Sequence, residues 1–407
     1  MQGSWPNHYY DALVYKEQSE MRKKILFVPS WYPNDDDPIS GVFIQEQAVA
    51  LSREFDVAVL IPGMAAWRNI ARANTPDRSA TKLQAGLRVY REFARPLIPH
   101  GPESTDYATF ARAAEKGFKK LVKEWGTPDV IHSHVVLPAG WSALKLSRRY
   151  AVPIVLTEHS SPFSMHLGTD LSRRLVRETL SGVNQVIAIS PALAEQLLEF
   201  HPGLDIQIIG ESVRTDFFVP VDGVDKKNAK AKRFFVAARL AEQKGLNHLL
   251  EAAHILLRNG LNSFELVIGG HGPDRLKLEN LATTLGLNEH CRFLGALNRE
   301  QVRDRMQQCD VFVLSSLHET FGVVLAEAMA CGKPVISTRC GGPEFVVNEE
   351  TGVLVDVGKP QEMADAMADF IAGRVAFDPE AVRKSVVSRF SPEVFVRNAT
   401  AVYERFW

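Results

Sequence analysis

Two glutamates, Glu319 and Glu327, stand where a strand passes into a helix, and their carboxylates suit hydroxyl groups. Glu319 lies in the loop at 317–322, and Glu327 lies inside the helix that begins near Val323. The free N–H groups at a helix start form a site for anions and hydroxyls. Carboxylates would repel a phosphate there unless they accept hydrogen bonds from hydroxyls. The pair therefore predicts one contact to a sugar ring and one to a ribose.

Two cations supply the positive charge that a diphosphate would need. Arg239 and Lys244 follow the apolar run at 234–237, at the carboxyl end of an expected strand, where ligands bind in parallel α/β sheets. Cations aimed at a departing nucleoside diphosphate stabilise its charge as the bond breaks. The run GGHGP at 269–273 also follows a strand, but it lacks the spacing of the dinucleotide fingerprint. It predicts close backbone approach rather than NAD.

Each of these groups also has a simpler interpretation. The two cations could form a surface ion pair with Glu242. The two glutamates could be a solvated loop residue and an acid favoured by the helix dipole. The downstream glycines favour the functional interpretation, because the run at 332–335 turns tightly into another strand and the run at 341–344 ends that strand with a second glycine-rich loop.

The elements that must hold these groups alternate along the chain. In the first half, apolar runs predict strands and amphipathic patterns predict helices. The expected strands are 25–28, 57–61, 89–93, 130–132, 154–157, 186–189 and 206–209, and the expected helices are 43–52, 110–125, 139–150, 171–180 and 192–199. A polar, charged segment at 222–232 suits a surface loop near a domain boundary.

The pattern then restarts. Strands are expected at 234–237, 265–268, 291–294, 311–314, 335–337 and 353–355, and helices at 245–257, 275–285, 300–309, 323–329 and beyond 361. Short, continuous apolar strands separated by helices indicate parallel sheets covered on both faces. We therefore expect two Rossmann-like, doubly wound α/β domains that face a cleft, where the ligand binds.

Length and charge bound the possibilities further. A chain of 407 residues exceeds the size of a single core, and a net charge of -1 gives no whole-molecule attraction to nucleic acid. No apolar run is long enough for a spanning helix. We place a first, N-terminal domain at 21–212 and a second, C-terminal domain at 213–390. Residues 1–20 form an extension or tag-like segment, and a last helix at 391–407 is expected to pack back on the first domain.

The run from Glu319 to Glu327 resembles the E-x7-E signature of the retaining glycosyltransferases of family 4, the glycosyl transferases group 1 type, which have the GT-B fold. Further motifs stand in the family's order: Arg239 before Lys244-Gly245, the glycines from 269, the strand end at 293–295 and the runs at 334–335 and 341–342. The first domain adds the glycine loop at 33–47 and two histidine-bearing strands at 128–134 and 156–159. The resemblance covers residues from about 21 to 400.

The resemblance implies that the N-terminal domain binds the acceptor and that the C-terminal domain binds the nucleotide sugar. It also implies a role for each matching residue. The two cations would bind the diphosphate, and Glu327 would bind the ribose. Glu319 and the backbone of 320–322 would bind the transferred sugar. The implied catalytic residues are His159, Glu319, Arg239 and Lys244, and the implied acceptor contacts are His134 and His159. The implied donor-binding residues are Gly41, Arg239, Lys244, Gly270, Leu294, Glu319, Thr320, Phe321, Gly322, Val323 and Glu327.

The family also implies a reaction. Its members need no cofactor or metal and keep the anomeric configuration, by front-face attack in which the leaving phosphate helps to take the acceptor's proton. We therefore expect a hexosyltransferase-type enzyme that moves a sugar from a UDP- or GDP-linked donor to a hydroxyl of a glycan or lipid-linked acceptor. The expected setting is bacterial cell-surface polysaccharide or glycolipid synthesis, with no nucleic-acid partner.

One loop departs from the family. Before Asp216 the family usually reads Asn-Gly-Val-Asp, whereas this chain reads Glu-Ser-Val-Arg at 211–214, so no role is transferred to that loop. Two alternatives stay open. A sugar-nucleotide 2-epimerase of the same fold would be expected to carry extra acids and bases around the sugar. A non-catalytic sugar-nucleotide-binding partner would not be expected to keep all of the cations and carboxylates intact.

Other clusters suggest different contacts. The acidic run at 35–37 favours an exposed loop over a metal site, because hard cations need spaced ligands. His132 and His134 share one face of a strand, but no third ligand is evident, so no metal is expected. Residues 68–95 are locally basic, which suits either a solvated face or a contact with an anionic acceptor or membrane surface. We expect a cytoplasmic protein, and the second option places it peripherally at the inner face of the cytoplasmic membrane.

Overall fold

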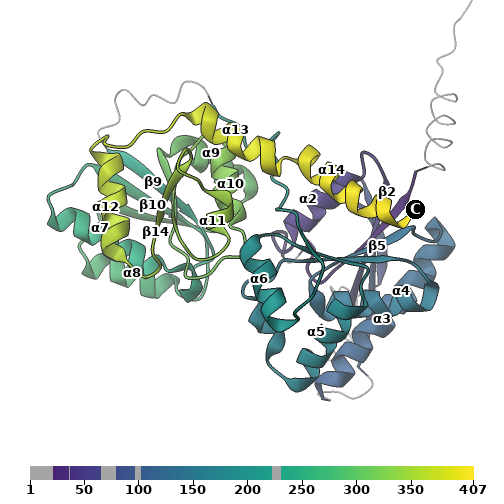
Figure 1. Ribbon diagram of the computed structural model, residues 1–407. Coiled ribbons are helices and arrows are strands. Elements are labelled where there is room, and N and C mark those ends of the chain that lie inside the picture. Colours follow the sequence, from purple (N-terminus) through teal and green to yellow (C-terminus); the bar gives the residue numbers. More distant parts are fainter. Residues whose placement is uncertain (1–21, 36, 66–78, 97–101, 222–230) are drawn as a thin grey trace, which may run out of the picture.

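The computed structural model describes residues 22–407, apart from residue 36 and the segments 66–78, 97–101 and 222–230. It has two lobes, each built on one sheet (Figure 1). The expected extension at 1–20 and the part of the basic stretch at 68–78 lie outside the described residues.

The first sheet has the strand order β3-β4-β2-β1-β5-β6-β7-β8, and every strand is parallel to its neighbour except β3. Its strands are β1 (Lys24–Pro29), β2 (Asp56–Met64), β3 (Ala80–Gln84), β4 (Leu87–Ala94), β5 (Val130–His134), β6 (Ile154–Glu158), β7 (Gln185–Ala188) and β8 (Ile206–Ile208). The antiparallel edge strand β3 was not predicted, because its residues are largely exposed and form no apolar run.

Helices cover both faces of this sheet. Ile25 and Phe27 of β1 pack in the cluster that contains α2, while Leu26 and Val28 pack in the cluster that contains α3 and α4. This alternation follows from the two-residue period of a strand. The helices are α2 (Val42–Leu51), α3 (Glu103–Trp125), α4 (Trp141–Tyr150), α5 (Asp170–Gly182) and α6 (Pro191–Phe200), with short turns at Val136–Gly140 and Phe163–Leu167.

The second sheet is parallel throughout, in the order β11-β10-β9-β12-β13-β14. Its strands are β9 (Lys232–Ala237), β10 (Phe264–Gly269), β11 (Cys291–Gly295), β12 (Val311–Leu314), β13 (Val335–Thr338) and β14 (Gly352–Val355). The helices are α7 (Leu246–Arg258), α8 (Arg275–Thr284), α9 (Arg299–Gln308), α10 (Val323–Ala330), α11 (Pro343–Val346), α12 (Pro360–Ile371) and α13 (Pro379–Phe390), with a short turn at Glu242–Lys244. The expected pair of doubly wound domains is confirmed.

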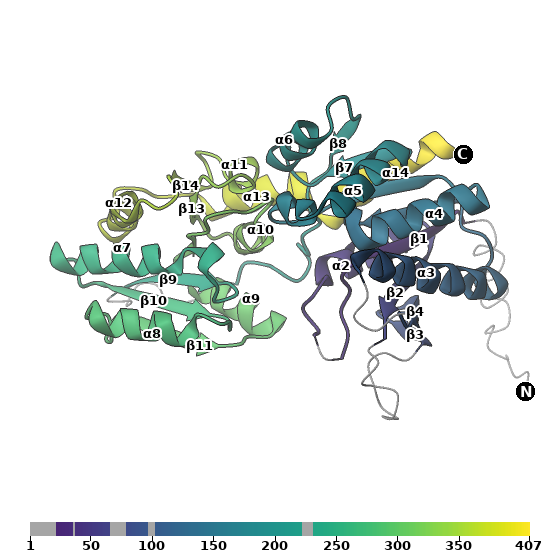
Figure 2. The same ribbon diagram turned by 90° about the horizontal axis from the view of Figure 1, so that it is seen from below.

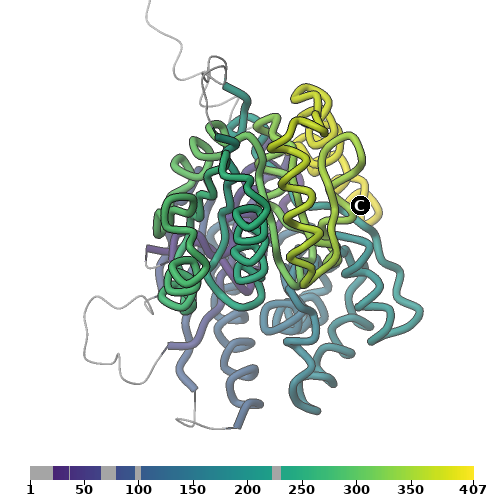
Figure 3. The backbone as a smooth tube through the Cα atoms, turned by 90° about the vertical axis from the view of Figure 1, so that its left-hand side faces the viewer, coloured from purple at the N-terminus to yellow at the C-terminus, as the bar shows by residue number. Residues whose placement is uncertain are grey.

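The last helix, α14 (Pro392–Tyr403), returns to the first domain, as predicted. It is followed by the short turn Glu404–Phe406. Phe395, Val402 and Tyr403 pack in one cluster with Ile25 and Ile44. Figures 1 and 3 show this yellow segment passing from the second domain to the first. The C-terminal helix therefore ties the two domains together.

The domains also share apolar packing. One cluster contains Leu156 and Val186 of the first sheet together with Phe312, Phe321 and Leu325 of the second domain. Figure 2 shows α10 and α13 on the side of the second domain nearer to the first. Within the described part of the chain, no helix is both long enough and apolar enough to cross a membrane.

Candidate active site

Loops from both domains line a cavity of about 1050 Å³. Residues 37–40, which follow β1, line it from the first domain. Arg239 after β9 and Gly270 and His271 after β10 line it from the second domain. These are the carboxyl ends of parallel strands, where the sequence predicted a ligand. The cavity is large enough for a small molecule with several polar groups.

Arg239 and Gly270 lie together at this cavity. Arg239 is exposed, and it forms no ion pair with Glu242 or any other described residue. Gly270 has φ +139°, and a Cβ there would lie 1.8 Å from the carbonyl oxygen of Ala238. The close backbone approach that the glycines predicted is thus an approach between two loops of the chain, which only glycine permits. It leaves Arg239 as a cation facing the cavity.

Lys244 and Glu319 contact each other directly. Lys244 Nζ lies 2.6 Å from Glu319 Oε1, and Ser316 Oγ donates to the same oxygen at 2.8 Å. The backbone of Lys244 is fixed as well, because its carbonyl accepts from Ser315 Oγ at 2.9 Å. Neither Lys244 nor Glu319 lines the large cavity. The predicted diphosphate cation and the predicted sugar carboxylate therefore form one ion pair.

The residues around the turn before α10 differ in backbone conformation and in burial. Gly322 has φ +85° and begins the helix. Phe321 is 2% exposed, and its ring packs edge-on against Phe390 with the centroids 5.1 Å apart. The ring of Phe321 belongs to the core, so the predicted donor contact at this residue stays a prediction for its backbone. Val323 at the helix start is half-buried, as is Leu294 near the end of β11.

Glu327 is buried and paired with an arginine that the sequence did not single out. Arg299, at the start of α9, donates through one nitrogen to Glu327 and through the other to Glu46 of α2 at 2.6 Å. Burial raises the pKa of Glu327 to about 7, because desolvation outweighs the attraction of Arg299. Burial also raises the pKa of Glu46. Arg299 thus bridges the two domains at the carboxylate that was predicted to bind the ribose.

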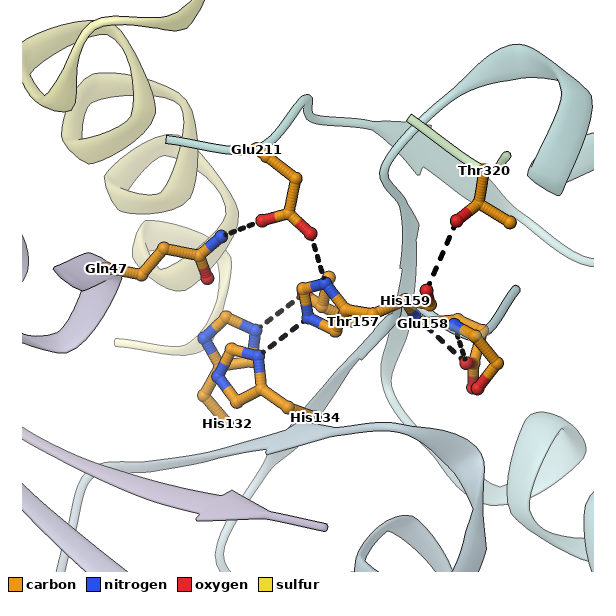
Figure 4. A network of polar contacts seen from close by, with 9 residues as sticks. Gln47, His132, His134, Thr157, Glu158, His159, Glu211 and Thr320 are labelled. Carbon is orange, nitrogen blue, oxygen red and sulfur yellow. Dashed lines mark hydrogen bonds and ion pairs between the residues drawn. The ribbon is translucent and has the colours of Figure 1, made fainter. Parts of the chain in front are cut away.

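His134 and His159 meet beneath the second domain's loop (Figure 4). His134 Nδ1 lies 3.0 Å from His159 Nε2, and the rings stack with centroids 5.3 Å apart. His159 also approaches the second domain, because its carbonyl accepts from Thr320 Oγ1 at 3.3 Å. Both rings are buried. The two histidines that the motifs singled out are therefore one cluster, at the junction of the domains.

The histidine rings have protein partners in this structure. Both nitrogens of His159 are engaged, one by His134 and one by Glu211 at 2.6 Å, and its contact with an acceptor stays a prediction. His134 Nε2 has no partner among the described residues and is buried. Burial, together with the neighbouring rings, lowers the pKa of His134 well below its usual value and that of His132 to about 3. Both imidazoles are therefore neutral near pH 7.

Glu211 belongs to the loop to which the sequence assigned no role. Its second carboxylate oxygen accepts from Gln47 Nε2 at 2.7 Å. Nothing in the local sequence could reveal this contact, since Gln47 lies 164 positions away. In the sequence, the departure from the family pattern at 211–214 was the one feature that could have drawn attention to Glu211.

The turn that starts α2 requires the backbone conformation of Gly41. It has φ +68°, and a Cβ there would lie 2.4 Å from the carbonyl oxygen of Trp31. Its lack of a side chain is thus needed by its own loop, and Gly41 is not among the residues that line the cavity. The neighbouring Ser40 and Ile39 do line it.

No group of three or more His, Cys, Asp or Glu side chains within the described ranges could hold a metal ion. His132 instead bonds to Tyr403 Oη at 2.6 Å and to Thr157 Oγ1 at 2.7 Å. In the described part of the basic stretch, Lys82 and Arg88 are exposed, whereas Arg91 donates to the carbonyl of Pro33.

Comparison with known proteins identifies the family. The model described as "Glycosyltransferase Family 4" matches residues 40–217, and that described as "Glycosyl transferases group 1" matches residues 222–384. The putative teichuronic acid biosynthesis glycosyltransferase TuaC of Bacillus subtilis is 26% identical over 362 residues, which is 85% of this chain and 89% of that protein.

Solved structures share the fold. Sucrose-phosphate synthase from Thermosynechococcus elongatus has a TM-score of 0.73 at 21% identity, covering 94% of this chain and 99% of that one. HepE of Anabaena, in complex with UDP, has a TM-score of 0.74 at 18% identity, covering 94% of this chain and all of that one. The chain belongs to the family 4, group 1 type glycosyltransferases with the GT-B fold.

Proposed function

We propose that this protein is a retaining glycosyltransferase that takes a sugar from a nucleoside diphosphate, UDP or GDP. The observation that carries the proposal is the Lys244–Glu319 ion pair, which sets a cation beside a carboxylate at the carboxyl ends of the second sheet. A sugar nucleotide needs these two charges next to each other, because its diphosphate and its sugar hydroxyls meet at the anomeric carbon. The UDP bound to the structural relative HepE makes UDP sugars the first candidates.

The proposed residues divide the donor between them. Arg239 and Lys244 hold the diphosphate, and Glu319 accepts hydrogen bonds from the sugar hydroxyls. Glu327, oriented by Arg299, accepts hydrogen bonds from the ribose hydroxyls. In the apo arrangement Lys244 and Glu319 compensate each other's charge. A bound diphosphate gives Lys244 a second anionic partner at the moment when the leaving group gains charge.

The proposed reaction is a front-face displacement. The acceptor oxygen bonds to the anomeric carbon on the face from which the diphosphate departs, and the carbon–oxygen bond to the phosphate breaks. The acceptor's proton passes to the departing phosphate, so no separate protein base, metal or cofactor takes part. This course retains the anomeric configuration.

The proposed acceptor is a hydroxyl of a glycan or of a lipid-linked sugar, in bacterial cell-surface polysaccharide or glycolipid synthesis. The relative TuaC is named for teichuronic acid biosynthesis, which supports this class of acceptor. A lipid-linked acceptor would place the protein in the cytoplasm, peripheral to the inner face of the membrane. The exposed Arg88 supplies part of the positive surface for that contact, and Lys82 adds to it although Asp35 lies 3.9 Å from its ammonium group.

The first experiment is a thermal-shift panel of UDP and GDP sugars, followed by product analysis with the stabilising donor. Release of nucleoside diphosphate and free sugar without acceptor supports a transferase, whereas appearance of the epimeric sugar nucleotide would indicate a 2-epimerase. No turnover of a bound donor would indicate a binding partner. Proton NMR of the transferred product reports the anomeric configuration, and EDTA should leave the rate unchanged.

The site assignment is tested by Glu319→Gln. This variant should lose donor turnover by about a hundredfold, because a charge-assisted contact is lost and Lys244 is left unpaired. Glu242→Gln is the matched control: Glu242 is exposed, close in sequence to Lys244, and forms no ion pair with a described residue. Equal rates for Glu319→Gln and the control would overturn the assignment.

A further inference from the structure

The buried carboxylate of Glu211 contacts His159, one of the predicted site residues. It lies in the segment that follows β8 and leads to the second domain. Its side chain is 2% exposed, and within the described residues its one charged or titratable partner is His159. A buried carboxylate is costly unless it is paired and hydrogen-bonded. Glu211 meets that condition through His159 and Gln47 alone.

The contact fixes the ring of His159. A carboxylate only accepts hydrogen bonds, so His159 Nδ1 carries the proton that Glu211 accepts at 2.6 Å. The other ring nitrogen then faces His134 Nδ1. The backbone of His159 is held too, because its N–H donates to Glu158 Oε1 at 2.9 Å. Every polar atom of His159 is therefore committed to a partner.

One of those partners belongs to the second domain. The carbonyl of His159 accepts from Thr320, which follows Glu319 in the sequence (Figure 4). The chain of contacts thus runs from Glu211 through His159 and Thr320 to the loop that carries the proposed sugar carboxylate. A shift of His159 is transmitted to that loop by a direct hydrogen bond.

We propose that Glu211 is a positioning residue for sugar transfer: it fixes His159, and His159 fixes the 319–322 loop against the first domain. The inference rests on the proposed function. Without the acceptor at Nδ1, the side chain of His159 loses one of its two ring partners, and the backbone carbonyl that Thr320 contacts is held less firmly. Displacement of a catalytic group by about 1 Å can cost about a hundredfold in rate.

The test compares Glu211→Ala, Glu211→Gln and Tyr403→Phe. Glu211→Ala should lower kcat by at least about tenfold with little change in the donor KM, because the diphosphate contacts stay in place. Glu211→Gln keeps an oxygen for His159 Nδ1 and should recover most of kcat. Tyr403→Phe removes a buried bond of equal length, to His132, whose other ring nitrogen bonds to Thr157 rather than to His159 or Thr320, and should leave kcat unchanged.

Unchanged kcat in Glu211→Ala, or equal losses in the glutamine and alanine variants, would overturn the inference. Histidine-selective nitrogen NMR gives a readout that needs no substrate. His159 should be protonated at Nδ1 in the wild type and in Glu211→Gln, and should lose that preference in Glu211→Ala. Unaltered protonation in Glu211→Ala would show that Glu211 does not fix the ring. Absence of transfer by a wild type that shows the Nδ1 form would refute the proposed function and leave the geometric assignment standing.

Discussion

Replacing Glu327 by glutamine should remove a pH dependence from the stability of the second domain. The folded protein holds this carboxyl at a pKa of about 7, against an ordinary value of 4.5. Between those two values the folded state keeps a proton that the unfolded chain releases. Stability is therefore highest at low pH and falls as the pH rises through this window.

The size of the effect follows from the two values. A shift of about 2.5 pKa units corresponds to roughly 3 kcal/mol of unfolding free energy, lost in full only above about pH 7. Glutamine cannot titrate, and its amide oxygen still accepts from Arg299. The unfolding free energy of Glu327→Gln minus that of the wild type should therefore increase by roughly 3 kcal/mol from about pH 5 to about pH 8.

Chemical denaturation followed by circular dichroism measures this difference. Tryptophan fluorescence is unsuitable, because all six tryptophans lie outside residues 213–390. Glu393→Gln is the control, since its carboxylate is exposed and pairs with Arg53 at 3.3 Å, a contact that solvent screens. A stability difference for Glu327→Gln that stays flat with pH, or that falls as the pH rises, would refute the reasoning.

Three further predictions follow from single contacts. Arg299→Met leaves Glu46 and Glu327 without their shared cation. It should lower the unfolding free energy by about 3 kcal/mol, measured by urea denaturation. An unchanged midpoint and slope of the urea transition would contradict this. Lys244→Met should reduce kcat/KM for the donor by about tenfold to a hundredfold in a nucleotide-release assay, because a charge-assisted contact is lost. Lys277, which is exposed on α8 and does not line the large cavity, gives the control, and Lys277→Met should keep the wild-type value. Gly41→Ala should lower the unfolding free energy by more than about 1 kcal/mol, because φ is +68° and the new Cβ would lie 2.4 Å from the carbonyl oxygen of Trp31; a melting temperature equal to that of the wild type would argue against this strain.

Apolar periodicity located most of the fold, since strands such as β12 and β13 are buried on both faces and read as continuous apolar runs. It failed where burial is weak. The edge strand β3 is largely exposed, and the first residues of α3 are mostly polar, so the helix starts at Glu103 rather than at the predicted 110. Hydrophobic patterning reports only residues that face a core.

The site was predictable where chemistry is local in sequence. Lys244 and Glu319 were found from the loops that carry them, because strand ends and helix starts can be recognised from a short window. Arg299 and Glu211 were missed, because their roles depend on partners across the fold: Glu46 is 253 positions from Arg299, and His159 is 52 positions from Glu211. A single sequence does not display such pairs.

The chain passes between the domains twice, after β8 and again between α13 and α14. These two crossings touch, since the N–H of Val213 donates to the carbonyl of Phe390 at 2.8 Å. The two linkers therefore form one joined connection, and a movement of the domains that separated residues 213 and 390 would have to break this hydrogen bond as well as disturb the apolar cluster that the domains share.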